Sequence, residues 1–180
     1  MSGQRPPGDG RGSPERILDA AAELFAGRGV GGVGMGEIAR AARCSRATLY
    51  RYFPDRHALH LAFVHREARR VGATVAAETA GLADPPERLA AAVLASVRLV
   101  REAPALLAWF GAADAATTAE LAQSSAVVEA LGRGLVDDED AARWLVRVIV
   151  SLLTVPGRDD HDERALVERF VVPAVATTPW

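Results

Sequence analysis

The sequence predicts an all-α protein, and three observations lead to this fold class. Alanine and leucine are abundant, alternating β-branched residues are scarce, and clusters of proline and glycine divide the chain into segments of about 10 to 25 residues. The chain has 180 residues, of which 49% are hydrophobic and 24% are charged. These values fit one ordinary domain, or a small domain joined to a modest one, and they exclude a fibrous or wholly disordered protein.

The first helix is expected to begin at Ser13-Pro14, because serine caps helices well and proline suits the first helical position. Apolar residues then recur at helical spacing from Ile17 to Phe25. Gly27-Arg28-Gly29 ends this helix, and further glycines follow through Gly36.

Two short helices are predicted next, over 37–42 and 46–53, with only Arg43-Cys44-Ser45 between them. Pro54-Asp55 ends the second of these and caps a longer helix that extends to about Ala80. Proline and glycine separate the remaining predicted helices, which span residues 86–101, 104–111, 115–133, 138–154 and 160–176.

The charges are distributed unevenly along the chain. Residues 1–70 hold twelve arginines and seven acidic residues, whereas residues 71–180 hold nine arginines and sixteen acidic residues. The chain contains no lysine, so its basic side chains are guanidinium groups that can bind phosphate through two parallel hydrogen bonds. A basic N-terminal part and an acidic C-terminal part predict that the N-terminal part binds a polyanion.

Other features concern location rather than fold. Residues 1–12 are rich in glycine, proline and charge without an apolar segment, so we expect a disordered leader, no signal peptide and a cytoplasmic protein. No apolar run is long enough to span a membrane. The single cysteine, Cys44, cannot form an internal disulfide, which fits a reducing compartment and excludes a zinc site built from cysteines.

The two short helices and their three-residue turn have the proportions of a helix-turn-helix, whose second helix enters the major groove of DNA. Ile38, Cys44, Leu49 and Phe53 are expected to form its small buried core. The exposed residues combine guanidinium, hydroxyl and methyl groups, which suit guanine edges, phosphate oxygens and a thymine methyl. This predicted DNA-binding set consists of Ser45, Arg46, Ala47, Thr48, Tyr50, Arg51 and Tyr52.

The residues themselves are more specific than the spacing. Glu37 to Ala42, Ser45 to Phe53 and Asp55 to Leu59 closely resemble the DNA-binding signature of TetR-family transcriptional regulators. The resemblance covers about residues 14–62, with the Thr-Leu-Tyr-x-Tyr-Phe core as its most specific part. It implies a three-helix DNA-binding domain over 13–60 and a helical domain for effector binding and dimerisation over 61–180.

The resemblance also implies roles for single residues. Base contacts are implied for Arg46, Ala47 and Tyr50. Contacts with phosphates or nearby bases are implied for Thr48, Arg51 and Tyr52. A phosphate contact is implied for Arg56, where the family usually has lysine.

The sequence departs from the family pattern at two places near this site. The family usually has threonine or serine at the start of the second helix, where this chain has Gly34, Met35 and Gly36 and so lacks a hydroxyl group. The turn usually contains glycine, but Arg43 occupies that place and is expected to strain the turn or to add a backbone contact. Both departures are expected to bear on operator preference.

The predicted helices over 138–154 and 160–176 each carry a broad apolar face. These faces could close a monomeric core, but the resemblance favours a homodimer in which the two helices pack against their copies. The two DNA-binding domains of a dimer, one turn of the DNA helix apart, would also bind an operator much more tightly than one domain alone.

An apolar effector pocket is predicted in the rear domain, with an ordinary helical core as the alternative. Its candidate lining residues are Leu106, Trp109, Phe110, Val127, Leu131 and Trp144. Arg98, Arg101, Gln123 and Arg147 could give polar contacts, or they could be surface and ion-pair residues. The ligand itself is not identified beyond a small hydrophobic or amphipathic molecule.

No cofactor, metal site or enzyme activity is predicted. His57 and His60 are spaced to chelate a metal from one helix, but exposed helix histidines are far more common than metal ligands. Catalytic motifs such as a nucleophile elbow or a phosphate-binding loop are absent from the sequence. The prediction is therefore a dimeric regulator that binds double-stranded operator DNA, a repressor released by its ligand. The alternatives are an activator and a helical ligand-binding or interaction protein without DNA binding.

Overall fold

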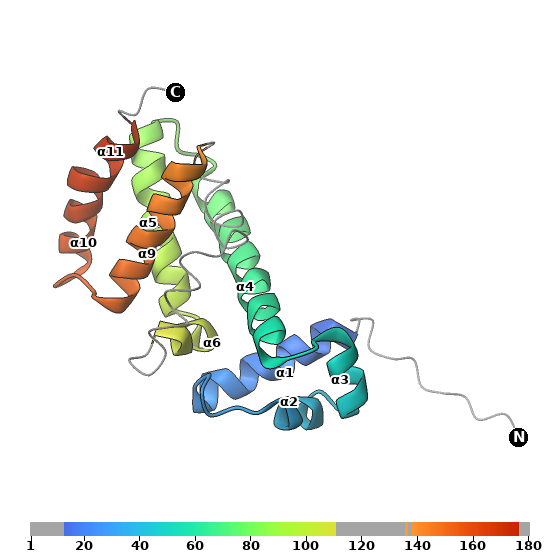
Figure 1. Ribbon diagram of the computed structural model, residues 1–180. Coiled ribbons are helices and arrows are strands. Elements are labelled where there is room, and N and C mark those ends of the chain that lie inside the picture. Colours follow the sequence, from blue (N-terminus) through green and yellow to red (C-terminus); the bar gives the residue numbers. More distant parts are fainter. Residues whose placement is uncertain (1–12, 111–135, 137, 177–180) are drawn as a thin grey trace, which may run out of the picture.

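The computed structural model describes residues 13–110, 136 and 138–176, and every regular element in them is helical. This confirms the all-α prediction. The predicted leader over 1–12 and the predicted helix over 115–133 lie outside the described residues. Figure 1 shows a small helical unit at the N-terminal end, joined by the long helix α4 to a larger group of helices.

The N-terminal unit consists of α1 (Ser13–Arg28), α2 (Met35–Ala41) and α3 (Arg46–Tyr52). Helix α1 packs on both of the shorter helices. Their shared core contains the buried side chains of Ile17, Phe25, Ile38, Leu49 and Phe53. Helix α2 begins two residues before its predicted start, because the Glu37 carboxylate accepts a hydrogen bond from the Gly34 backbone N–H at 2.9 Å and closes the first turn.

Helix α4 (Arg56–Thr79) connects the two parts of the chain without a break. It begins where Asp55 caps it, with the Asp55 carboxylate accepting a hydrogen bond from the Ala58 N–H at 2.7 Å. The side chain of Arg66 then binds α4 to α1, because its guanidinium lies 2.9 Å from Asp19 and 3.4 Å from Glu15. The orientation of α4 is therefore tied to that of the N-terminal unit.

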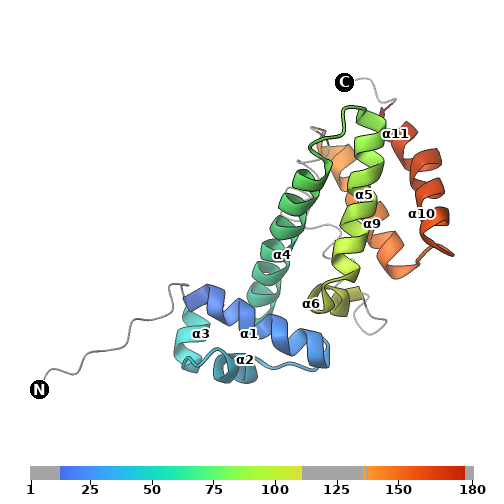
Figure 2. The same ribbon diagram turned by 180° about the vertical axis from the view of Figure 1, so that it is seen from behind.

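The larger group is arranged around α5 (Pro85–Arg101), which packs against α4, α6 (Pro104–Leu107), α9 (Glu139–Thr154) and α10 (Asp160–Leu166). Figure 2 shows α5 between α4 and α10. The predicted helix over 104–111 is observed as α6 followed by a 3-10 turn, η1 (Ala108–Phe110). The predicted helix over 160–176 is continuous through α10, a π-helical stretch, η4 (Val167–Val171), and α11 (Val172–Ala176).

One partly buried ion pair fixes α10 against α5. The Arg101 guanidinium donates two hydrogen bonds to the Glu163 carboxylate, at 2.7 and 2.9 Å, and a third to the Leu152 carbonyl at 3.0 Å. The Gly157 N–H also donates to Glu163, and the hydrogen bonds from Arg101 hold the pKa of this carboxyl below its usual value. Of the two roles that the sequence left open for Arg101, the structure selects the ion-pair partner.

Within the described residues, no helix combines the length and apolar character needed to cross a bilayer.

Candidate nucleic-acid interface

Helix α3 presents one polar face to solvent because its other face is anchored by two side chains. Leu49 and Phe53 are buried in the N-terminal core, and Ser45 caps the helix by accepting a hydrogen bond from the Thr48 N–H at 3.0 Å. The predicted DNA-binding residues lie on the opposite side of the helix or at its ends. Those exposed to solvent are Ser45, Arg46, Ala47, Tyr50, Arg51 and Tyr52.

Thr48 differs from the other members of this set. It is half-buried, and its hydroxyl group lies 2.9 Å from that of Ser45, so the two hydroxyls share a hydrogen bond. The ring of Tyr50 is 47% exposed on the same helix. Tyr50 is therefore the more exposed of the two tyrosines of α3, whereas Thr48 serves the local helix cap.

Arg51 and Tyr52 form a pair at the end of α3. The Arg51 guanidinium lies 5.0 Å from the centre of the Tyr52 ring, and it donates a long hydrogen bond of 3.4 Å to the Tyr52 hydroxyl. A cation held over an aromatic ring keeps its charge while losing some of its conformational freedom. The pair therefore forms a partly ordered, exposed donor group at the end of α3.

Arg56 is exposed, but its guanidinium is turned toward the loop between α1 and α2. It donates to the Val30 carbonyl at 2.6 Å and to the Gly31 carbonyl at 3.3 Å, and its Nε donates to His60 at 3.3 Å. The bonds to the two carbonyls join the start of α4 to a loop 25 and 26 residues earlier in the chain, whereas the bond to His60 lies within α4. The sequence suggested only a phosphate contact for Arg56 and gave no sign of this structural role.

An ion pair at the start of α2 was not predicted from the sequence. Arg28 donates to the Glu37 carboxylate at 2.6 Å and to the Gly32 carbonyl at 2.8 Å. The hydrogen bond from Arg28, together with that from the Gly34 N–H, lowers the pKa of the Glu37 carboxyl. An acidic residue in the first turn of a short helix was the signal available in the sequence.

The turn between α2 and α3 is closed by an arginine in the left-handed region. Arg43 has φ of 51°, a conformation that favours glycine, and its N–H donates to the Arg40 carbonyl at 3.1 Å. This agrees with the strain expected from arginine in the place of glycine. Cys44, expected to be buried, is only half-buried, because it lies at the edge of the small helix-turn-helix core.

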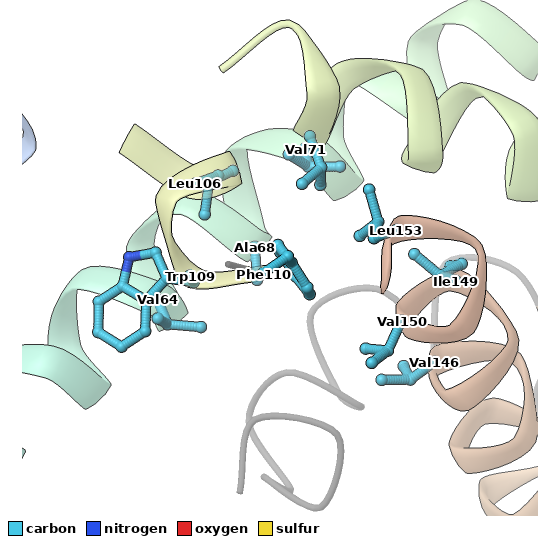
Figure 3. Close-up of a pocket in the computed structure, with 11 residues that line it drawn as sticks. Val64, Ala68, Val71, Leu106, Trp109, Phe110, Val146, Ile149, Val150 and Leu153 are labelled. Atoms are coloured by element: carbon cyan, nitrogen blue, oxygen red, sulfur yellow. The ribbon is translucent and has the colours of Figure 1, made fainter. Parts of the chain in front are cut away.

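A separate apolar cavity lies in the larger group of helices, with a volume of about 50 Å³ (Figure 3). Of the predicted pocket residues, Leu106, Trp109 and Phe110 line it. The remaining walls come from α4, α5 and α9, and they were missed because their residues fit equally well a plain helical core. These additional lining residues are Val64, Ala68, Val71, Val100, Val146, Ile149, Val150 and Leu153.

Trp144 does not belong to this cavity, which corrects the prediction. Its side chain is 47% exposed, because on α9 it points away from the face that carries Leu145, Ile149 and Leu153 into the core. Val127 and Leu131, also predicted to line the pocket, lie outside the described residues.

His60 lies in an aromatic cluster at the junction of the two parts. Its ring is 4.9 Å from that of Trp109 and 5.6 Å from that of Phe25, both nearly perpendicular to it. Burial, with a smaller contribution from Arg56, lowers the pKa of His60 to about 4. Among the described residues, no three histidine, cysteine or acidic side chains are grouped to hold a metal ion.

Comparison with known proteins agrees with this geometry. Residues 17–63 match the family model described as "Bacterial regulatory proteins, tetR family". An uncharacterized HTH-type transcriptional regulator of Mycobacterium tuberculosis is 48% identical over 170 residues, which cover 89% of this chain and 84% of the relative. The matched segment of the family model contains α2, α3 and the start of α4.

Two solved structures have the same fold. The TetR family repressor AlkX of Dietzia sp. strain DQ12-45-1b, implicated in biodegradation of n-alkanes, aligns with a TM-score of 0.74 at 19% identity, covering 95% of this chain and 99% of AlkX. The structure of RolR in complex with resorcinol aligns with a TM-score of 0.63 at 26% identity, covering 93% of this chain and 94% of RolR.

The N-terminal unit of three helices exposes one face of α3, the second helix of its helix-turn-helix, and a helical domain follows it. This arrangement defines a helix-turn-helix regulator of transcription that binds DNA. The identity with the mycobacterial regulator extends this assignment over most of the chain. The chain belongs to the TetR family of transcriptional regulators, which are not enzymes.

Proposed function

We propose that this regulator is a homodimeric repressor, which leaves its operator when a small hydrophobic or amphipathic molecule binds in the helical domain. The exposed face of α3, with Arg46, Tyr50 and Arg51 turned to solvent, is the observation that supports operator binding. The division of the chain near residue 60 belongs to the same proposal, although α4 runs through this position as one helix.

Exposed apolar side chains on the last helices support the homodimer. Trp144 on α9, Leu166 at the end of α10 and Phe170 in η4 are 47%, 39% and 58% exposed. Large apolar groups that remain exposed on neighbouring helices commonly mark an interaction surface. Burial of these helices against their copies would give each operator two recognition helices.

The apolar cavity supports the proposed ligand class. Its lining residues carry aliphatic and aromatic side chains, so polar groups of a ligand would find few partners there. Its volume of about 50 Å³ is small, and we infer that a ligand enlarges it by moving side chains. RolR, which is similar to this chain in fold and sequence, is known in complex with resorcinol.

Trp109 provides a physical route from the cavity to the DNA-binding unit. The residue lines the cavity and also packs its ring against Phe25 of α1 and His60 of α4. Displacement of Trp109 by a ligand would shift α1 and α4 together, since Arg66 ties these helices. In a dimer, such a shift changes the spacing of the two recognition helices.

The test is binding of the purified protein to the DNA upstream of its own gene and to random DNA of equal length, over a series of salt concentrations. We expect tighter binding to the upstream DNA, with two protomers or more per site, and a decrease in affinity as salt rises. Tyr50→Ala is the matched variant, expected to weaken upstream binding while it keeps the thermal stability of the wild type. Equal weak binding to both DNAs would contradict an operator at that place.

A transcription assay from the same DNA then tests the direction of control. Transcription that falls when the protein is added supports a repressor, and transcription that rises shows an activator. Release of the DNA by small aromatic or aliphatic compounds supports the ligand part of the proposal. We expect the same compounds to bind the Tyr50→Ala variant, because this change lies far from the cavity.

A further inference from the structure

The guanidinium group of Arg46, at the start of α3, lies against Gly36 in the first turn of α2. A Cβ atom placed on Gly36 would overlap Nη2 of Arg46, and it would lie 3.1 Å from Nε and 3.2 Å from Cζ of the same side chain. Real Cβ atoms essentially never lie as close as the overlap with Nη2 requires, so a side chain at position 36 would displace the flexible end of Arg46. The guanidinium therefore occupies the space that a side chain at position 36 would take.

The backbone at Gly36 does not itself require glycine. The residue lies within helix α2, and Gly29 is the glycine with positive φ among the described residues. Glycine inside a helix is less stable than alanine, because it loses more backbone entropy on folding. What glycine provides at this position is room for Arg46, whereas a Cβ on Gly27 in α1 would meet nothing within 4 Å.

The chemistry around Arg46 leaves its charge available. Among the residues that the structure describes, no hydrogen bond or ion pair engages the Arg46 guanidinium. Glu37, next to Gly36 in α2, is already bound by Arg28 and by the Gly34 N–H. The side chain of Arg46 is exposed, so its position over α2 places an uncompensated cation on the surface of the helix-turn-helix.

In a helix-turn-helix the first helix crosses the phosphate backbone, and the second helix enters the major groove. Figure 2 shows α2 beside α3, and a guanidinium that lies against Gly36 in the first turn of α2 would be beside the phosphate backbone rather than at the floor of the groove. We propose that Arg46 binds a backbone phosphate of DNA and that Gly36 is a positioning residue, because the absence of a side chain there leaves room for the guanidinium. This contact differs from the base contact that the resemblance implies for Arg46.

The first test compares Arg46→Ala with the wild type on two probes. One probe is random-sequence duplex DNA, and the other is the operator that the wild type selects from a random duplex pool. We expect the affinity for both probes to fall by a similar factor, and the slope of log K against log salt to become shallower by about 0.9. A loss confined to the selected operator would overturn the proposal, because it would make Arg46 a base contact.

The second test is a double-mutant cycle with Gly36→Ala. This change is expected to lower DNA affinity in the wild type, to leave thermal stability equal or slightly higher, and to have no further effect in Arg46→Ala. Gly27→Ala is the control and is expected to leave DNA affinity unchanged. A Gly36→Ala effect that is absent, or that persists in full without Arg46, would overturn the positioning role.

This inference rests on the proposed DNA binding, but the two can fail separately. A wild type that selects no operator contradicts the regulator function. The role of Arg46 is still tested in that case, by comparing the salt dependence of binding to random duplex DNA between the wild type and Arg46→Ala. An unchanged slope in Arg46→Ala overturns the phosphate contact even when the wild type selects an operator.

Discussion

The rings of Trp109 and Phe25 lie 5.7 Å apart at an angle of 88°, which joins the cavity wall to the first helix of the DNA-binding unit. Phe63 extends this contact, with its ring stacked at 5.9 Å on that of Trp109. Perpendicular and stacked aromatic pairs of this kind add about 0.5–1.5 kcal/mol beyond the burial of their surface. The junction between the two parts of the chain is therefore a packed core rather than a flexible linker.

Trp109→Ala is expected to lower the free energy of unfolding by about 3–5 kcal/mol, because it removes a fully buried aromatic side chain at this junction. Leu107→Ala, at the exposed end of the preceding helix α6, is the control and is expected to cost less than about 1 kcal/mol. Chemical unfolding followed by circular dichroism measures both. If Trp109→Ala lowered the free energy of unfolding as little as Leu107→Ala does, the junction would contribute little to stability.

His60 makes the stability of the protein depend on pH. Its pKa of about 4 in the folded protein lies below its usual value of 6.5, so the unfolded chain takes up the proton first as the pH falls. The stabilising contribution is present above about pH 6.5 and is lost between that pH and 4. The wild type loses unfolding free energy between about pH 6.5 and pH 4, and we expect His60→Gln to make this loss smaller by about 1–2 kcal/mol. This figure allows for the partial exposure of the ring.

The control for this prediction is His161→Gln, since His161 is exposed at the start of α10. Unfolding in denaturant at several pH values between 7 and 4 supplies the comparison. If His60→Gln kept the full slope of the wild type, other groups would carry the dependence on pH.

The short helices were predictable because their signals are local. Ser45 caps α3 three residues from its hydrogen-bond donor, and Leu49 faces the core by simple helical spacing. The observed start of α4 follows in the same way from Asp55. Such features depend on neighbours within one or two turns, which a single sequence displays directly.

Contacts between distant segments were not predictable. The carbonyl that Arg56 binds lies 26 residues away, and the Glu163 partner of Arg101 lies 62 residues away. The cavity draws its walls from four helices, so apolar periodicity within one helix could not separate its lining from ordinary core. Trp144 shows the same limit, because a broad apolar face does not tell which edge of the helix is buried.

Arg43→Gly is expected to stabilise the protein by about 0.5–1 kcal/mol. Arginine in the left-handed region costs about 1–2 kcal/mol, and the gain exceeds the greater backbone entropy that glycine brings to the unfolded chain. Arg40→Gly, three residues earlier in helix α2, is the matched control, and it is expected to destabilise by a similar amount. Thermal unfolding shows whether each variant is more or less stable than the wild type. A loss of stability in Arg43→Gly would mean that the arginine makes a compensating contact.

Phe170→Asp is expected to convert the proposed dimer into a monomer, because it replaces an exposed apolar side chain of the proposed interface with a carboxylate. Light scattering coupled to size-exclusion chromatography gives the mass in solution. Val155→Asp is the control, since Val155 is 72% exposed in the loop after α9. A wild type that is monomeric, or a Phe170→Asp variant that remains dimeric, would place the interface elsewhere.

Arg56 combines a structural contact with a charge near the DNA-binding face, and substitution separates the two. Arg56→Ala removes the hydrogen bonds to the Val30 and Gly31 carbonyls, and we expect a loss of about 1–2 kcal/mol in stability. We also expect weaker binding to operator and random DNA alike, with a shallower dependence on salt, if the side chain reaches a phosphate when DNA is bound.

Arg56→Lys distinguishes the two contributions, because lysine keeps the charge but cannot reproduce the planar group that spans two carbonyls. A phosphate contact predicts that Arg56→Lys recovers most of the salt slope while stability stays below that of the wild type. A role confined to the loop predicts that the slope is the same in all three proteins and that only stability varies. Salt titrations of random duplex DNA, together with thermal unfolding of the same samples, decide between them.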